Sequence, residues 1–107
     1  MIPTKRKPST PGHLLKVFYL DPLKKAGWTY ERFAKHIGID RVRLSGIING
    51  RRAVTADTAI RLSKALGTSP QMWMNAQSIY ELSIADNIKG IRKIRMPSIG
   101  TDSNAGQ

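Results

Sequence analysis

The sequence predicts an all-α domain built from five helices, and three observations support this prediction. Between residues 12 and 86 apolar residues recur at spacings of three and four, and no segment alternates like a half-buried strand. Serine, threonine or aspartate precedes most of these segments and glycine follows several of them, as helix caps do. A length of 107 residues is enough for one compact domain with short ends.

The first helix is expected to begin near Pro11-Gly12. It should end or kink at Asp21-Pro22, because a proline ring clashes with the preceding helical turn. The predicted buried face of this helix consists of Leu14, Leu15 and Phe18.

Two short helices follow in close succession. Thr29 is the expected N-cap of the first, which ends at Gly38, and Asp40 caps a second helix that runs to about Asn49. A short helix, a turn containing glycine and a second short helix form the helix-turn-helix plan. The two helices should share a buried seam made of Phe33, Ile37, Leu44 and Ile47.

Two further helices complete the predicted domain. Thr55 caps a fourth helix, which Gly67 ends, and Ser69-Pro70 begin a fifth helix that runs to about Asp86. The fourth helix is expected to bury Ala59, Leu62 and Leu66. The fifth is expected to turn one stripe toward the core, consisting of Met72, Trp73, Ala76, Ile79, Tyr80 and Ile84.

A second apolar patch on the fifth helix predicts a homodimer. It consists of Met74, Leu82 and Ala85, and one helix cannot bury two faces against a small domain. Residues 70–86 contain no Lys or Arg, which avoids like-charge repulsion across a two-fold axis. A neighbouring loop that covers the patch is the alternative.

Both ends of the chain are predicted to lie outside the folded domain, which spans residues 12–86. Residues 1–11 contain three prolines and the cluster Lys5-Arg6-Lys7, which predicts a flexible basic arm. Residues 87–107 are predicted to form a mostly disordered basic tail. For each segment, contact with DNA and a solvated state remain open alternatives.

The charge balance favours a polyanionic partner. Eighteen Lys and Arg residues stand against seven Asp and Glu residues, giving a formal net charge of +11, which suits nucleic acid or an anionic membrane. A membrane-binding helix needs basic residues beside its apolar face, and the apolar segment 70–86 has none. No apolar run is long enough for a span or placed like a signal peptide, so a cytoplasmic location is expected.

No catalytic, metal or cofactor site is expected. The chain has no cysteine, its two histidines lie far apart in the sequence, and its few acidic residues are scattered. An enzyme would need a nucleophile with its base or a cluster of metal ligands, and the sequence offers neither.

The predicted third helix presents a face suited to the major groove of DNA. Small residues on that face allow close approach, and arginines can reach guanine or phosphate. The alternative is an ordinary helix with a solvated basic face. The face consists of Val42, Ser45, Gly46 and Asn49, flanked by Arg41 and Arg43.

Residues 29–66 resemble the Cro/repressor (XRE) helix-turn-helix family, whose fold is lambda-repressor-like. The run Ser45-Gly46-Ile47-Ile48-Asn49-Gly50-Arg51-Arg52 and its continuation to Pro70 are similar to the HigA/VapI branch. Met72-Trp73-Met74-Asn75-Ala76-Gln77, followed by Tyr80-Glu81-Leu82, is similar to that branch's Phe-Trp-Leu-Asn-Leu-Gln and Tyr-Asp-Leu. Upstream, Pro8, Pro11-Gly12 and Leu14-Leu15 fit its Pro-x-x-Pro-Gly-Glu-x-Leu opening, although His13 replaces the glutamate.

The resemblance implies a set of DNA contacts and two partners. It places Arg41, Val42 and Ser45 at base edges. It implies phosphate contacts from Thr29, Tyr30, Arg43, Asn49, Arg51 and Arg52. It also implies an antitoxin that binds double-stranded DNA at an inverted-repeat operator, represses its own operon and neutralises an RNA-cleaving HigB-type toxin. A stand-alone XRE-family regulator without a toxin is the alternative.

Overall fold

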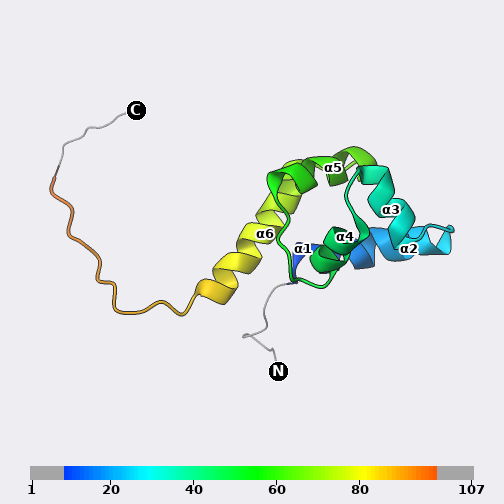
Figure 1. The fold of residues 1–107 in the computed structure, drawn as a ribbon. Helices are drawn as coiled ribbons and strands as arrows, with labels where there is room; N and C mark the ends of the chain where they lie inside the picture. The colour runs from blue at the N-terminus through cyan, green and yellow to red at the C-terminus, as the bar shows by residue number, and fades with distance from the viewer. Residues whose placement is uncertain (1–8, 99–107) are drawn as a thin grey trace, which may run out of the picture.

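The structure is a computed structural model that describes residues 9–98. Within this range the chain forms five helical segments and no strand, which confirms the predicted all-α class. The segments surround one core, and α6 leads away from it toward the C-terminal residues (Figure 1). Their bounds are α1 (Pro11–Leu15) continued by the π-helical turn η1 (Lys16–Leu20) and α2 (Asp21–Lys25), then α3 (Tyr30–Ile37), α4 (Arg41–Ile48), α5 (Ala56–Leu66) and α6 (Pro70–Ala85).

The first helical segment passes through Asp21-Pro22, so the predicted end at this point is wrong. The helix is instead irregular directly before the proline, at the π-helical turn η1. The backbone N–H of Asp21 donates to the carbonyl of Lys16, five residues earlier instead of four. The helical turn η1 therefore contains one residue more than a regular α-helical turn. In a regular α-helix the ring of Pro22 would clash with the carbonyl of residue 18. The wide turn thus lets the helix continue to Lys25.

The same wide turn changes which side chains are buried. Leu15 and Leu20, five residues apart, both face the core, whereas a regular helix would pair residues three or four apart. Phe18, predicted to be buried, is 64% exposed, and Leu14 is only partly buried. The prediction failed here because it assumed an unbroken 3.6-residue period.

The other helices begin and end where their capping residues predict. Gly38 and Gly67 have φ of 82° and 74°, the left-handed conformation that ends α3 and α5. At each N-terminus a side-chain oxygen accepts a hydrogen bond from the backbone N–H three residues later. These caps are Thr29, Asp40, Thr55 and Ser69.

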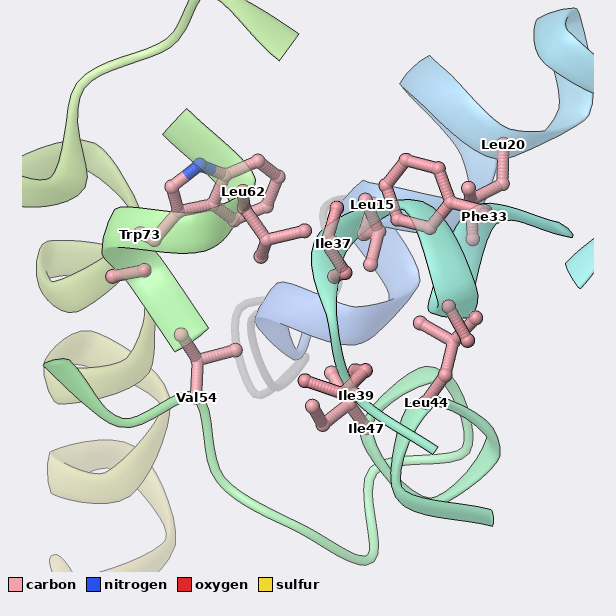
Figure 2. Packing of buried hydrophobic residues seen from close by; sticks show 12 residues of the cluster. Leu15, Leu20, Phe33, Ile37, Ile39, Leu44, Ile47, Val54, Leu62 and Trp73 are labelled. Atoms are coloured by element: carbon pink, nitrogen blue, oxygen red, sulfur yellow. The ribbon is translucent and has the colours of Figure 1, made fainter. Parts of the chain in front are cut away.

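The core lies where α1, α3, α4, α5 and the start of α6 meet (Figure 2). Trp73 is fully buried in it and donates from Nε1 to the Thr68 hydroxyl at 2.7 Å. Two buried residues, Ile39 and Val54, lie in connections where helical periodicity gave no signal. The predicted seam of Phe33, Ile37, Leu44 and Ile47 is confirmed as buried.

Gly12 allows α1 to lie directly on the end of α4. A Cβ atom at this position would overlap the carbonyl oxygen of Ile47, and it would also lie 2.9 Å from the Cα of Ile48. No side chain can relieve this overlap, because both neighbours are backbone atoms. The Pro11-Gly12 step therefore fixes where the first helical segment meets α4.

The core-facing side of α6 differs from the predicted stripe. Trp73 and Gln77 are buried, and the Gln77 Oε1 accepts a hydrogen bond from the Val54 N–H at 2.8 Å. Met74, assigned to the outward patch, is partly buried against the core, so that assignment is wrong. The other two patch residues, Leu82 and Ala85, are exposed as predicted.

Much of the predicted stripe also faces solvent. Met72, Ile79 and Ile84 are exposed, because the helix is rotated toward Gln77 and its second half extends beyond the domain. Residues 87–98 follow with no helix or strand, and their side chains are exposed. Residues 1–8, most of the predicted arm, and 99–107 lie outside the described range.

Candidate nucleic-acid interface

The turn between α3 and α4 is fixed by glycine and by an arginine of α5. Gly38 takes a positive φ, and a Cβ there would lie 2.6 Å from Nη1 of Arg61. That guanidinium donates to the Ile37 carbonyl at 2.9 Å, where the last carbonyls of α3 lack helical partners. Nε of Arg61 donates to Asp57 at 2.9 Å, so α5 holds the angle between the two helices.

The N-terminal turn of α4 is open to solvent. Arg41 is exposed and Val42 is 69% exposed, so a charged group and an apolar group stand side by side. Ser45, one turn further on, is partly buried, and its Oγ accepts a hydrogen bond from Nδ2 of Asn49 at 3.3 Å. The structure therefore brings Arg41, Val42, Ser45 and Asn49 together on one helix, as predicted.

Gly46 does not belong to this open face, and its predicted place there is wrong. It is buried, and a Cβ would lie 2.9 Å from Cγ of Arg52. The backbone N–H groups of Arg51 and Arg52 both donate to the Gly46 carbonyl, at 2.8 and 3.0 Å. Gly46 thus gives room for the loop after α4 to fold back, and this places both exposed arginines beside the helix.

Arg43 is directed toward α5 within its own chain. Its Nη2 donates to the hydroxyl of Thr58 at 2.8 Å, and Asp57 lies 3.7 Å away. Thr58 is almost completely buried, so this bond gives its buried hydroxyl group a hydrogen-bond partner. Its predicted contact with phosphate remains a prediction, and the side chain has a structural role as well.

Two basic side chains lie around the ring of Tyr30 at the start of α3, and the sequence pattern did not predict that Lys24 is one of them. The ring of Tyr30 has the Nζ of Lys24 at 5.0 Å and the Cζ of Arg41 at 5.4 Å from its centroid. Lys24 comes from α2, and no local sequence signal links it to a residue of the next helix. Thr29, which caps α3, is exposed at the same edge.

A second aromatic contact supports the other side of α3. The guanidinium of Arg32 lies over the ring of Trp28 at 3.9 Å, and His36 meets the same ring edge-on at 5.4 Å. Trp28 is partly buried by these contacts and packs against the core. The loop before α3 is thereby held against the helix.

The cations of this surface are not neutralised by the chain itself. Within residues 9–98 the ion pairs involve Lys16, Arg43 and Arg61. Arg41, Arg51 and Arg52 take part in none of them, and all three are exposed. One unpaired guanidinium group at the start of α4 and two beside its last turn suit a polyanion.

Within residues 9–98, no helix is long and apolar enough to cross a membrane.

Comparison with known proteins identifies the family of this chain. A helix-turn-helix family model matches residues 23–73. Antitoxin HigA-1 of Vibrio cholerae is 40% identical over 79 residues, which are 74% of this chain and 71% of the relative. This chain belongs to the HigA branch of the helix-turn-helix family. The resemblance noted in the sequence is thereby confirmed.

Two other relatives of this HigA-branch chain bear on its function. The structure of Pseudomonas aeruginosa antitoxin HigA with the higBA promoter has a TM-score of 0.68 and 32% identity. It covers 74% of this chain and 83% of that one. An uncharacterised helix-turn-helix transcriptional regulator of Escherichia coli, YbaQ, is 34% identical over 82 residues, covering 77% of this chain and 70% of the relative.

Proposed function

We propose that this HigA-branch chain binds an inverted-repeat operator in double-stranded DNA as a homodimer and represses its own operon. The observation that carries the proposal is the open N-terminal turn of α4, with unpaired Arg41 at its start and unpaired Arg51 and Arg52 beside the last turn of the same helix. The P. aeruginosa relative, whose structure includes the higBA promoter, supports the same role.

The reading contacts are assigned to the exposed part of α4. Arg41 can donate two hydrogen bonds to guanine, the methyls of Val42 can contact a thymine methyl, and Ser45 can bond to several base edges. Arg41 lies at the first position of the helix, so its side chain can extend beyond the helix end into the groove.

The remaining contacts are assigned to the phosphates. Arg51 and Arg52 reach past α4 from the loop that folds back on Gly46. Tyr30 lies at the start of α3, where backbone N–H groups and the helix dipole favour an anion, and Lys24 of α2 lies near its ring. Thr29 and Asn49 supply polar groups at the two ends of this surface.

The homodimer is assigned to the exposed C-terminal half of α6. Leu82 and Ala85 are uncovered in the single chain, and α6 contains no Lys or Arg. A two-fold axis here would place two α4 helices on one side of the dimer. Half-sites in the operator are then expected about 34 Å apart, one turn of DNA.

The operator proposal is tested by DNA-binding titrations. The full chain is titrated against a duplex carrying the inverted repeat upstream of its gene, and against a shuffled duplex of equal length and composition. We expect tighter binding to the inverted repeat, with two chains per duplex. Equal affinity for both duplexes would contradict the proposal.

We further propose that the chain neutralises an RNA-cleaving toxin of the HigB type, as its relationship to antitoxin HigA-1 suggests. A basic toxin would be repelled by a chain of net charge +11 except near its acidic groups. Such groups include Glu81 and Asp86, on and after α6, and Asp21, which is itself paired with Lys16 at 3.3 Å. The contact is therefore expected away from the α4 surface.

Co-expression with a small basic protein encoded beside the gene tests this second part. We expect the two proteins to co-purify and the chain to restore growth. If they neither co-purify nor restore growth, a stand-alone regulator is the better function, and similarity to YbaQ already supports that alternative.

A further inference from the structure

The side of α6 that faces away from the core carries an uncovered apolar stripe. Met72 and Ile79 are seven residues apart, which is two helical turns, and Leu82 lies one turn beyond. These three side chains are 39%, 58% and 68% exposed. We call Met72, Ile79 and Leu82 the outer stripe, and the described chain leaves it open to solvent.

The residues after α6 contain a three-residue repeat. Ile88, Ile91 and Ile94 are each followed by a basic residue: Lys89, Arg92 and Arg95 respectively. The isoleucines are 71–82% exposed and contact no core residue. An extended chain with three residues per turn places every third side chain on one edge, so from Ile91 onward the repeat provides an apolar edge next to a basic one. Gly90, with φ of 87°, turns the chain between Ile88 and Ile91.

The spacing of this repeat fits the outer stripe. Isoleucines three residues apart in an extended chain are about 9 Å apart along its axis. Met72 and Ile79, seven residues apart in a helix, are about 10 Å apart along its axis. Two neighbouring isoleucines can therefore sit over these two stripe residues.

The charges of the two segments are complementary. Residues 88–96 contain Lys89, Arg92, Lys93 and Arg95 and no acidic residue. α6 contains no Lys or Arg, carries Glu81, and is followed directly by Asp86. Two copies of segment 88–96 would repel each other, whereas this segment and α6 attract.

We propose that residues 88–96 of one copy lie along the outer stripe of α6 in a second copy. The isoleucines cover Met72 and Ile79, and the basic edge extends toward Asp86 at the helix end. Glu81 lies on the Gln77 side of α6, where it accepts a hydrogen bond from Gln77 Nε2 at 2.8 Å. The backbone N–H of Asn87 donates to the Ala85 carbonyl at 2.8 Å, and beyond this turn the segment leads away from its own α6 (Figure 1). The inference rests on the proposed dimer and assigns the C-terminal segment to it.

Disulfide cross-linking tests this contact, because the chain has no cysteine of its own. One protein carries Ile79→Cys and a second, of different tag length, carries Ile91→Cys. Mixed under mild oxidation, they should form a disulfide-linked dimer of mixed size. As a matched control, Ile60→Cys, an exposed isoleucine on α5, should not link to Ile91→Cys at a comparable rate.

Three results would overturn the proposal. These are preferential linkage of Ile91→Cys to itself, no mixed dimer above the Ile60→Cys control, or an internal disulfide in monomers of the double variant Ile79→Cys with Ile91→Cys. Sedimentation of the unmodified chain at the same concentration separates this failure from failure of the proposed dimer. A dimer without the cross-link contradicts only the C-terminal contact.

A second measurement does not depend on disulfide geometry. Replacing Ile88, Ile91 and Ile94 together by serine removes the apolar edge and leaves every charge in place. We expect the dimer dissociation constant to rise about tenfold or more, because several methylene groups lose their cover. An unchanged dissociation constant would contradict the proposal. Helical content should stay the same, since these side chains lie outside the core.

Discussion

At the scale of single residues, the arginines around α4 differ in what holds them. Arg41 contacts the ring of Tyr30 and takes part in none of the ion pairs within residues 9–98, so its guanidinium can reorient toward a base. Arg43 is bonded to Thr58 inside the protein. The stem of Arg52 lies over Gly46 while the residue remains exposed. Three arginines within one short segment therefore suit different roles: Arg41 suits contact with bases, Arg43 stabilises the fold, and Arg52 suits contact with phosphate.

The difference between reading and anchoring can be measured with alanine variants. Arg41→Ala or Ser45→Ala should change the preference among operator sequences, by about 1–3 kcal/mol for each bidentate pairing with a base that the substitution removes. Arg51→Ala and Arg52→Ala should weaken all duplexes by similar factors, because phosphates are alike in every sequence. Fluorescence anisotropy on a panel of single-base operator variants distinguishes these results. The same uniform decrease for all four variants would remove α4 from the reading role.

Arg43 is expected to affect folding as well as binding. In Arg43→Ala the buried hydroxyl of Thr58 loses its charged donor, and the free energy of unfolding should fall by about 1 kcal/mol. Arg41→Ala, a matched exposed arginine on the same helix, should change it by less than about 0.5 kcal/mol. Urea denaturation followed by circular dichroism gives both values. Equal stability of the two variants would show that the Thr58 contact contributes nothing.

At the scale of the elements, the ends of the last four helices were predicted well, whereas the end of the first helix and the buried faces of several helices were not. Thr29, Asp40, Thr55 and Ser69 signal local events, since each cap acts within three residues of its own position. The face that a helix buries depends on its tertiary neighbours. Met74 turned inward because Trp73 and Gln77 together set the rotation of α6, and nothing local specifies that rotation.

The candidate site shows the same division. The exposure of Arg41 and Val42 follows from helical periodicity, so the sequence was sufficient to predict it. The contacts of Arg43 with Thr58 and of Gly46 with Arg52 depend on how α5 and the following loop return to α4. Long-range contacts of this kind leave no periodic signal in the sequence.

The outward half of α6 leads to a prediction about assembly. Leu82→Glu combined with Ala85→Glu should give a monomer that keeps its fold, because both side chains are exposed in the single chain. Operator affinity should fall strongly, since a monomer contacts only one half-site. Ile60→Glu on α5 is a matched control and should remain dimeric. Sedimentation velocity decides the question, and an unchanged dimer in the double variant would place the interface elsewhere.

At the scale of the whole molecule, the positive charge of the helical domain is concentrated away from α6, and the basic residues of segment 88–96 follow beyond its end. The surface around α4 carries unpaired arginines, whereas residues 70–86 contain no Lys or Arg. A molecule with this asymmetry is drawn to DNA with its basic side first, and the opposite side stays available for a protein partner. DNA binding and the proposed contacts of α6 therefore use separate surfaces.

This asymmetry predicts a steep dependence of operator binding on salt. The logarithm of the association constant should fall linearly with the logarithm of salt concentration, with a slope of about −0.9 for each phosphate that the protein neutralises. Arg51→Ala should reduce the steepness of the slope by about one for each phosphate that is no longer neutralised. Titrations at several potassium chloride concentrations provide the slope. An association constant that does not change with salt concentration would show that contacts with phosphates contribute little to operator binding.

The wide turn η1 can be regarded as a one-codon insertion carried inside a helix. Deleting the codon for Phe18 and replacing Pro22 by alanine should restore an ordinary α-helix, with Leu15 and Leu20 then four positions apart and still on one face. Homologues that lack the proline can thus lack one residue here as well, and an alignment gap belongs within this helix. Aligned relatives in which loss of the proline never coincides with such a gap would argue against this origin.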